Sequence, residues 1–488
     1  MHAPVSTIAA AALLAVEPAV AAASSAAGTP RANLLVISTD DQDHGSLRAL
    51  RPDGRPVMSE LLSRVAAQGA TFARAFVSYP LCSPSRATLL TGQLAHNHGV
   101  LGNDGPSGGH GALDHANTLP VWLRAAGYRT AHVGKYLNGY TGGPPPPGWD
   151  VWCTSWGGGY YNYFTNEDGT NVAHGTGAAH YHTDVMTQKA VDFVRSRAPG
   201  DPPFFLKLDY LAPHKGNPLA GGTAAAPRHQ GTLAELAPQW PPSFNELDLS
   251  DKPPSIQALP LLSDDQVRGV LERDRRRLET LLAVDEGIGR VLTALAETGE
   301  LERTFVFFTS DNGYLRGEHR IDGGKNHPYD EATRVPLVVR GPGIAPGSVI
   351  EELVSNVDLA PTWVEIAGAT AGLPPDGRSL LALLEGRAAA WREAVLIESF
   401  VLEPSLPPAP PAIVRPYLAL RTRDHLYVER NSAAGLEREL YLLAADGCAP
   451  ADPFQLESQH ANPCEAAALE AAGARLAALS TCAGDGCW

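Results

Sequence analysis

The fold of this chain is constrained most by short apolar runs that alternate with helical patterns. The runs lie at residues 33–39, 129–133, 204–210, 304–309 and 335–339. Amphipathic stretches at 57–68 and 264–297 lie between them, and Ser263 is a possible N-cap for the longer one. Short apolar runs of this kind are typical of strands buried on both faces. Their alternation with helices predicts an α/β fold with a central, mostly parallel sheet flanked by helices.

Polar side chains stand just past the ends of four of these runs. They are Asp40 and Asp41 after the first run, Lys135 after the second, His214 after the third, and Asp311 and Asn312 after the fourth. In open α/β sheets, ligands bind at the carboxyl ends of the strands. We therefore expect these side chains, which are far apart in the sequence, to converge on one pocket.

Three parts of the chain differ in their patterns. Residues 1–30 contain an Ala/Leu-rich apolar stretch followed by small residues, which resembles a secretory signal peptide or a disordered leader. Residues 31–392 hold the alternating runs and form the main domain. From residue 393 the runs become shorter and a final helix is expected at 466–479, so residues 393–488 are predicted to form a smaller C-terminal α+β subdomain. We expect the protein to be secreted, periplasmic or on the cell surface.

The chain is acidic, with a formal net charge of −15. Such a protein is a poor candidate for non-specific nucleic-acid binding, so no nucleic-acid partner is predicted. No segment after the leader approaches the roughly 20 apolar residues that span a bilayer, so no membrane span is predicted either. An acidic protein also repels anionic substrates at long range. A site for an anion therefore requires cations that are concentrated locally.

The cysteines fall into two groups. The C-terminal group consists of Cys448, Cys464, Cys482 and Cys487. Such clustering suits disulfides in an exported protein, and we expect the last two to pair across a short loop and the first two with each other. A zinc site is less favoured because paired C-x-x-C spacing is missing. Cys82 and Cys153 then stay as free thiols.

Cys82 begins the most specific motif of the chain. The stretch from Cys82 to Gly92 reads CSPSRATLLTG and fits the pattern C-x-P-S-R followed by T-G. We expect it to begin a helix, with Pro84 in the first turn. Unpaired backbone N–H groups at such a helix N-terminus favour an anion. The alternative interpretation is a buried structural cysteine in front of a helix.

The acidic and amide side chains at the strand ends predict a metal site. Asp40, Asp41 and Asp311 supply carboxylates, and Asn312 supplies an amide. Oxygen-rich sets of this kind suit a hard cation such as Ca²⁺, whereas His ligands favour Zn²⁺ or Mn²⁺. Asn312 in place of a His therefore favours Ca²⁺. Either pair alone also fits a capping or turn role.

These pieces together resemble the type I, formylglycine-dependent sulfatases of the alkaline-phosphatase superfamily. The pattern is closest to the N-acetylglucosamine-6-sulfatase and arylsulfatase branch, through the stretches TDDQD, LCSPSRATLLTG, GKYLNGY, APH, TSDNGY and YDEATRVPLVVRGPG. The resemblance implies an alkaline-phosphatase-like fold, with residues 31–392 as the catalytic domain. It also implies hydrolysis of a sulfate monoester, either a sulfated sugar or an aryl sulfate, to an alcohol and inorganic sulfate.

The resemblance further implies how the site is built. Cys82 would be oxidised to formylglycine by a formylglycine-generating enzyme, and one hydroxyl of the hydrated aldehyde would attack sulfur. One Ca²⁺ would be held by Asp40, Asp41, Asp311, Asn312 and the modified Cys82. Arg86 would hold the diol. The sulfate would be bound by Lys135, His214 and Lys325, and either of the last two would protonate the leaving alcohol.

Some features leave alternatives open. Many arylsulfatases carry a His two residues after the Lys that matches Lys135, whereas here Leu137 stands there and Asn138 follows. Whether Asn138 takes over the role of that His is left open. Four aromatic side chains suit either stacking on a sugar or aryl ring or packing within the fold, namely Trp149, Tyr160, Tyr161 and Tyr163.

Two other functions compete with sulfate ester hydrolysis. A phosphonate or phosphate ester hydrolase of the same superfamily is the second candidate, although Asn312 and the stretch GKYLN favour sulfate. A non-catalytic protein that binds sulfated glycans, with Cys82 left unmodified, is the third. The chemical state of Cys82 distinguishes this last candidate from the two enzymes.

Overall fold

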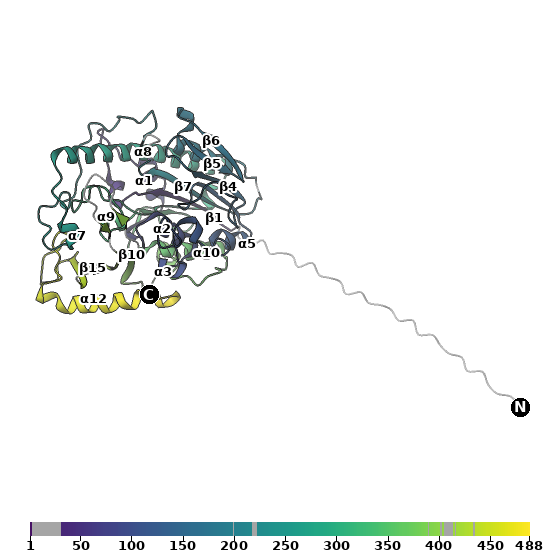
Figure 1. Ribbon diagram of the computed structural model, residues 1–488. Helices are drawn as coiled ribbons and strands as arrows, with labels where there is room; N and C mark the ends of the chain where they lie inside the picture. Colours follow the sequence, from purple (N-terminus) through teal and green to yellow (C-terminus); the bar gives the residue numbers. More distant parts are fainter. Residues whose placement is uncertain are drawn as a thin grey trace. The chain divides into compact units, whose positions relative to one another are not determined.

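The computed structural model describes residue 1 and residues 31–198, 200–216, 222–388, 390–400, 403–404, 413–414, 416–432 and 435–488. The leader expected within residues 1–30 falls, apart from its first residue, outside the described residues. Arg31–Trp488 forms one compact unit, which contains all the helices and strands (Figure 1) described for this chain. Within the described ranges, no helix combines the length and the apolar character needed to cross a membrane.

A ten-stranded sheet forms the centre of the unit, in the order β10-β2-β9-β8-β1-β7-β3-β4-β5-β6. Its middle strands are β8 (Thr304–Ser310), β1 (Asn33–Asp40), β7 (Phe204–Pro213), β3 (Arg129–Lys135) and β4 (Val151–Trp156). Each of these runs parallel to the next. The predicted α/β class with a mostly parallel central sheet is therefore confirmed.

The outer strands carry the antiparallel pairings of this sheet, although the pair of β10 and β2 is parallel. They are β2 (Ala70–Phe76), β5 (Tyr163–Glu167), β6 (Thr170–His174), β9 (Leu337–Arg340) and β10 (Ser348–Ser355). The sequence pattern predicted β9 as a strand of the parallel sheet, but it runs antiparallel to both neighbours, β8 and β2. The connection from β8 stays at the carboxyl edge of the sheet, where the N–H of Gly313 bonds to the carbonyl of Ala332. Strand β9 begins at that same edge and therefore runs antiparallel to β8. A parallel pair would need a crossover connection to the opposite edge of the sheet.

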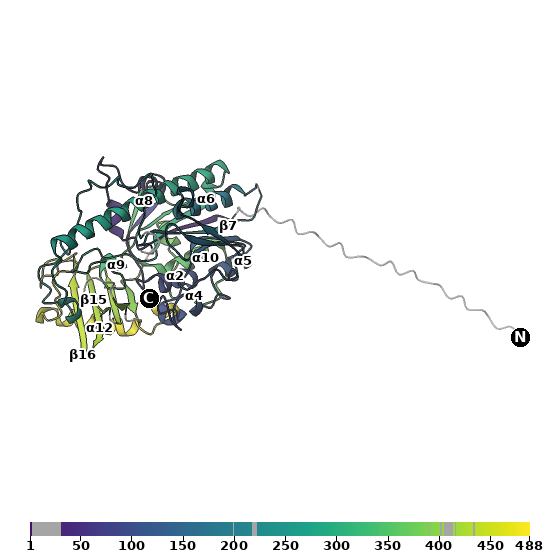
Figure 2. The same cartoon turned by 45° about the horizontal axis from the view of Figure 1, so that its top comes forward.

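Two helical layers cover the two faces of the sheet (Figure 2). One layer contains α1 (Ser59–Arg64), α6 (His182–Arg195) and α8 (Asp264–Glu297), which share a core with Leu35 and Ile37 of β1. The other contains α2 (Cys82–Thr91), α5 (Leu119–Ala125) and α10 (Leu359–Ala367), which share a core with Leu34 and Val36 of the same strand. Successive side chains of a strand point to opposite faces, so one apolar run serves both cores. Shorter helices are α3 (Ala95–His98), α4 (Gly109–Ala112), α7 (Pro254–Gln257), α9 (Asp330–Thr333) and α11 (Leu381–Leu384).

A smaller antiparallel sheet follows near the C-terminus. Its strands, in spatial order, are β11 (Ala394–Ser399), β14 (Tyr417–Thr422), β15 (His425–Ser432) and β16 (Gly435–Leu442). The pair β12 (Glu403–Pro404) and β13 (Ile413–Val414) lies between the first two in sequence. Helix α12 (Ala466–Leu479) packs against the sheet through Leu476 and Leu479. Disulfides join Cys448 to Cys464 and Cys482 to Cys487, as expected from their clustering.

Candidate active site

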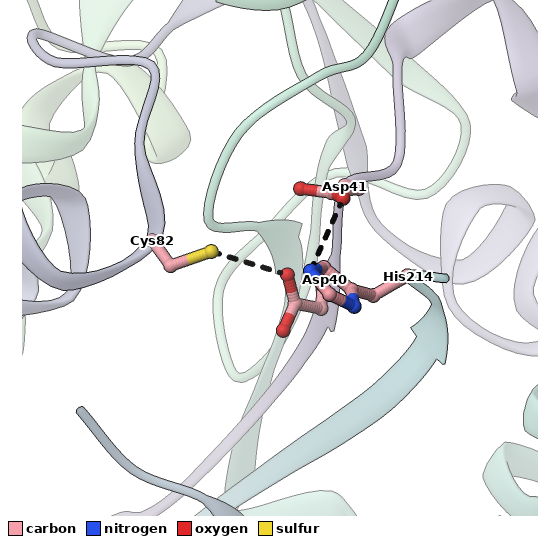
Figure 3. Close-up of side chains that lie close together, drawn as sticks. All are labelled: Asp40, Asp41, Cys82 and His214. Carbon is pink, nitrogen blue, oxygen red and sulfur yellow. Dashed lines mark hydrogen bonds and ion pairs between the residues drawn. The ribbon is translucent and has the colours of Figure 1, made fainter. Parts of the chain in front are cut away.

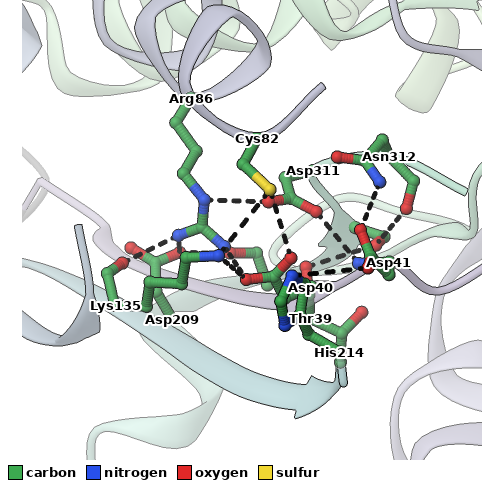
Figure 4. Close-up of polar contacts among 12 residues, drawn as sticks. Thr39, Asp40, Asp41, Cys82, Arg86, Lys135, Asp209, His214, Asp311 and Asn312 are labelled. Carbon is green, nitrogen blue, oxygen red and sulfur yellow. Dashed lines mark hydrogen bonds and ion pairs between the residues drawn. The ribbon is translucent and has the colours of Figure 1, made fainter. Parts of the chain in front are cut away.

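The pair Asp40 and Asp41 meets the pair Asp311 and Asn312 at the carboxyl edge of the central sheet, because β1 and β8 are parallel neighbours (Figure 4). Asp40 ends β1, and Asp41 follows it with a φ of 67°. The backbone N–H of Asp41 donates to Asp311 Oδ1 at 3.1 Å, and Asn312 Nδ2 donates to Asp41 Oδ1 at 2.6 Å. All four side chains are fully buried. The strand register therefore brings the predicted oxygen ligands together.

Cys82 is the first residue of α2 and faces this acidic edge (Figure 3). Its Sγ lies 3.5 Å from Asp40 Oδ1, 3.7 Å from Lys135 Nζ and 2.8 Å from Lys325 Nζ. Burial, with Asp40 adding to it, raises the pKa of the Cys82 thiol to about 12 despite the two lysines. The thiol is therefore protonated at neutral pH, and a protonated thiol is a poor nucleophile.

The N-terminus of α2 is less open than the sequence suggested. The backbone N–H of Ser83 donates to Asn103 Oδ1 at 2.9 Å, so this group is already paired. The Ser83 hydroxyl donates to Asn138 Oδ1 at 3.2 Å and accepts from the Asn138 backbone N–H at 3.0 Å. Asn138 thus contacts the residue after Cys82, while Leu137 is buried.

Arg86 lies one turn further along α2 and is buried, with its guanidinium to one side of Cys82 (Figure 4). Its Nε donates to Asp311 Oδ2 at 2.9 Å, its Nη1 donates to the Lys135 carbonyl at 2.7 Å, and its Nη2 lies 3.4 Å from Asp40 Oδ2. Burial alone would lower the pKa of Arg86, but Asp311 and Asp40 outweigh it and raise this pKa. The guanidinium is therefore a fixed positive charge between the helix and the acidic edge.

Three further cationic or basic groups line the same place. Lys135 Nζ donates to Asp40 Oδ2, Lys325 Nζ donates to Asp41 Oδ1 at 2.6 Å, and His214 Nε2 lies 3.7 Å from Asp41 Oδ2. Burial would lower the pKa of Lys325, but Asp41 raises it well above its ordinary value. Burial lowers the pKa of His214 to about 4 despite the two aspartates, so this ring is neutral at pH 7. The local concentration of positive charge that an anionic substrate requires is present here.

The donor atoms of this cluster fit a hard cation. One ligand atom each from Asp40, Asp41, Cys82 and His214 lie within 4.8 Å of one another. Asp41 Oδ2 and Asn312 Oδ1 are buried oxygens without a hydrogen-bond donor in the described part of the chain. Such oxygens are costly unless a donor or a cation satisfies them. Nearby cations, chiefly Lys135, outweigh burial and hold the pKa of Asp40 below its ordinary value, so this ligand is ionised. Oxygen-rich, ionised sets are those that Ca²⁺ prefers.

Some residues of this region were missed or left open by the sequence analysis. Lys207 and Asp209 lie inside β7, next to Arg86, and the only signal for them was two charges at alternate positions of an apolar run. The aromatic side chains pack within the fold: Tyr160 stacks on Tyr181 with ring centroids 5.8 Å apart, and Trp149 stacks on Phe205 at the same distance. Tyr160 still contributes to the site, because its hydroxyl donates to the His214 carbonyl at 2.9 Å.

Comparison with known proteins identifies the family. The sulfatase family profile matches residues 32–369, and a profile for the C-terminal part of N-sulphoglucosamine sulphohydrolase matches residues 317–441. The chain is 35% identical to an extracellular sulfatase SULF-1 homolog of Drosophila melanogaster over 392 residues, which are 77% of this chain and 34% of that protein. It is 34% identical to human N-acetylglucosamine-6-sulfatase over 409 residues, which are 80% of this chain and 72% of that protein.

A solved structure extends this likeness to the whole fold. It holds a protein in complex with its substrate, D-glucosamine-2-N,6-O-disulfate, and aligns with a TM-score of 0.77 at 25% sequence identity. The alignment covers 92% of this chain and 97% of the other. The matched part is only about a third of the Drosophila protein. The activity of that whole protein is therefore not assigned to this chain. The profile match over more than half of the residues is decisive for the family, and the chain belongs to the sulfatases.

Proposed function

We propose that this protein hydrolyses a sulfate monoester to an alcohol and inorganic sulfate, through a formylglycine made from Cys82 and with one bound Ca²⁺. The observation that carries the proposal is the position of Cys82, which lies between ionised carboxylates and buried ammonium groups in a chain of the sulfatase family. Carboxylates alone would repel a sulfate ester, and ammonium groups alone would not bind a divalent cation. The arrangement around Cys82 offers both.

The state of the thiol supports a modified rather than a thiolate nucleophile. A Cys82 thiol with a pKa of about 12 is almost fully protonated at neutral pH. Formylglycine, made by a formylglycine-generating enzyme, is hydrated to a carbon that bears two hydroxyls. One hydroxyl attacks sulfur and releases the alcohol. The second then loses its proton, the C–O bond to the sulfate breaks, and the aldehyde is restored as sulfate leaves.

The oxygen ligands would hold the metal beside this carbon. The proposed set is Asp40, Asp41, Asp311, Asn312 and the modified Cys82. A bound Ca²⁺ would supply positive charge to the sulfate oxygens and favour ionisation of a hydroxyl at the site. The unpartnered oxygens Asp41 Oδ2 and Asn312 Oδ1 support this assignment. His214 also offers a nitrogen nearby, but an imidazole suits softer metals than Ca²⁺.

The cationic side chains of the site would bind the nucleophile, the sulfate group and the leaving alcohol. Arg86 would hold the diol, because it lies one helical turn after Cys82 and its guanidinium is fixed by Asp40 and Asp311. Lys135 and Lys325 would bind sulfate, since each Nζ is within 3.7 Å of Cys82 Sγ. Lys325 would donate a proton to the leaving alcohol, because its ammonium group stays charged whereas burial lowers the pKa of His214 to about 4 and leaves that ring neutral at pH 7. Fixed charges of this kind stabilise a transition state in which charge moves to the leaving oxygen.

A sulfated sugar is the substrate class that the comparisons favour. The human relative is named for N-acetylglucosamine 6-sulfate, and the similar solved structure contains D-glucosamine-2-N,6-O-disulfate. An aryl sulfate is the second class, because arylsulfatases of Volvox carteri and Chlamydomonas reinhardtii are 35% and 33% identical to this chain, each over 72% of it. The name of the Drosophila relative supports export, and we propose a secreted, periplasmic or cell-surface location.

The decisive experiment compares two free cysteines of the same chain. The protein is produced together with a formylglycine-generating enzyme, and the Cys82 peptide is analysed by mass spectrometry. Sulfate release is measured with 6-O-sulfated glucosamine, an aryl sulfate and an aryl phosphonate, with and without chelator. We expect an aldehyde at Cys82, chelator-sensitive release from a sulfate ester, and no release by Cys82→Ala.

Cys153 is the matched control because it is also buried and free. Cys153→Ala is expected to keep the aldehyde at Cys82 and the activity. A folded protein that keeps a thiol at Cys82 and releases no sulfate would refute the proposal. Faster turnover of the phosphonate than of every sulfate would replace it with the phosphonate hydrolase.

A further inference from the structure

Strand β7 carries an ion pair in its interior, below the floor of the site. Lys207 Nζ donates to Asp209 Oδ1 at 2.5 Å and to Oδ2 at 2.6 Å, and both side chains are almost completely buried. Asp209 also accepts from His132 Nε2 at 3.0 Å and from the Ser38 hydroxyl. The neighbouring strands β1 and β3 therefore both help to fix this carboxylate in one position.

Asp209 also lies close to Arg86 (Figure 4). Asp209 Oδ1 lies 3.9 Å from Arg86 Nη1, so the carboxylate stands between Lys207 and the guanidinium. Arg86 is surrounded by three carboxylates, and the other two are Asp40 and Asp311. Arg86 is almost completely buried, so these carboxylates are its main counter-charges.

The three carboxylates around Arg86 differ in whether they are also proposed to bind the metal. Asp40 and Asp311 belong to the proposed metal ligands, so a bound divalent cation would draw their charge away from Arg86. Asp209 already has hydrogen-bond donors on both oxygens, with Lys207 on each, the Ser38 hydroxyl on Oδ1 and His132 on Oδ2. It is therefore the carboxylate that stays with Arg86 when the metal is bound.

We propose that Asp209, anchored by Lys207 and His132, is a positioning residue that holds Arg86 against the nucleophile in the metal-loaded enzyme. This inference rests on the proposed function. A buried guanidinium that loses its counter-charges is costly and tends to move. A small displacement of a group that orients the nucleophile reduces the rate strongly. Asp209 acts through Arg86 and touches no substrate atom.

The test replaces the ion pair by neutral groups of similar size, Lys207→Met together with Asp209→Asn. Exchange of a buried ion pair for neutral groups is often tolerated by the fold. We expect kcat per aldehyde-bearing site to fall about tenfold or more, with KM changed by less than about threefold, because Arg86 acts on the nucleophile and not on the bound sulfate. The rise in Tm on adding Ca²⁺ is expected to shrink, since binding then leaves Arg86 without a carboxylate.

The matched control is Asp285→Asn, which removes another buried carboxylate far from Arg86. Asp285 accepts from the backbone N–H groups of Glu60 and Leu61, both at 2.9 Å, at the start of α1. This control is expected to lower Tm while kcat and the Ca²⁺-dependent rise in Tm stay as in the wild type. If the double variant does not fold, Ser38→Ala removes a single donor from Asp209 and is expected to lower kcat about threefold with little change in Tm.

The outcomes separate this inference from the proposed function. Wild-type activity combined with unchanged kcat and unchanged Ca²⁺ response in the double variant overturns the positioning role alone. A double variant that loses Tm but keeps kcat overturns it too, because the pair is then merely structural. A wild-type protein without aldehyde and without sulfate release refutes the proposed function instead.

Discussion

At the scale of single residues, burial and nearby charges decide which groups of the site are charged. Lys135 and Lys325 are both buried, and burial alone would lower the pKa of each. The carboxylates of Asp40 and Asp41 outweigh this and raise both values, so the two ammonium groups stay charged at neutral pH. His214 in the same place is neutral, with a pKa lowered to about 4 mainly by burial. The permanent positive charge at this place therefore comes from the two lysines and Arg86, and not from His214.

Lys325 is the sharpest single-residue test of this charge arrangement. Lys325→Met keeps most of the side-chain volume but removes the ammonium group that lies 2.8 Å from Cys82 Sγ. We expect kcat/KM for a sulfate ester to fall about 100-fold or more, because a fixed charge at the reacting group is lost. Lys189→Met is the control, since Lys189 lies in the middle of α6 and pairs with Glu167, and both side chains are partly exposed. Equal activity of the two variants would contradict the role of Lys325.

At the scale of elements, sequence patterns located the long buried elements but not the two strands at one end of the central sheet. The bounds of α8 and α12 agree with the predicted ranges, and α8 begins with the capping box of Ser263 and Gln266. Strands β2 and β10 were not predicted. They carry charges such as Arg74 and Glu351 inside the strand, and Arg74 bonds to Glu351 across the pair. Such segments become strands through pairing at the sheet edge, which has no local signature.

Two glycines of α8 predict opposite effects of the same substitution. A Cβ at Gly287 would lie 2.5 Å from Thr187 Oγ1 and 2.6 Å from Tyr210 Oη, inside the core. A Cβ at Gly269 would meet only the flexible end of Arg273, at 3.3 Å. We expect Gly287→Ala to lower the free energy of unfolding by about 2 kcal/mol through overpacking. We expect Gly269→Ala to raise it by about 0.5–1 kcal/mol, because alanine favours the helix. Chemical denaturation measures both, and a shift of the same sign in both would contradict the packing of α8 on α6 and β7.

At the scale of the whole molecule, His96 ties the helical layer around α2 to the C-terminal part. Its Nδ1 lies 2.7 Å from Glu398 Oε2 of β11, and its Nε2 lies 2.9 Å from the Cys482 carbonyl. Burial would lower the pKa of His96, but the hydrogen bond and charge of Glu398 outweigh it and raise this pKa from 6.5 to about 9. The contact is therefore strongest when the ring is protonated.

The raised pKa of His96 predicts a dependence of stability on pH. A pKa raised on folding contributes stability that is complete below the unfolded value of about 6.5 and is lost as pH rises through about 9. We expect Tm to fall more between pH 6.5 and about 9.5 in the wild type than in His96→Gln. Thermal unfolding in matched buffers measures this difference. Parallel Tm curves for the two proteins would show that His96 does not carry the effect.

By itself, the sequence determined the α/β class and the group of polar residues that shares one edge of the sheet. The physical reason is local: apolar runs of strand length alternate with helices, and parallel strands end at the same edge. Only the tertiary structure decided that Lys207 and Asp209 lie beside Arg86, that the aromatic side chains Trp149 and Tyr160 pack inward, and that β9 runs antiparallel. These depend on register and packing between segments far apart in the chain, for which no spacing within one segment carries a signal.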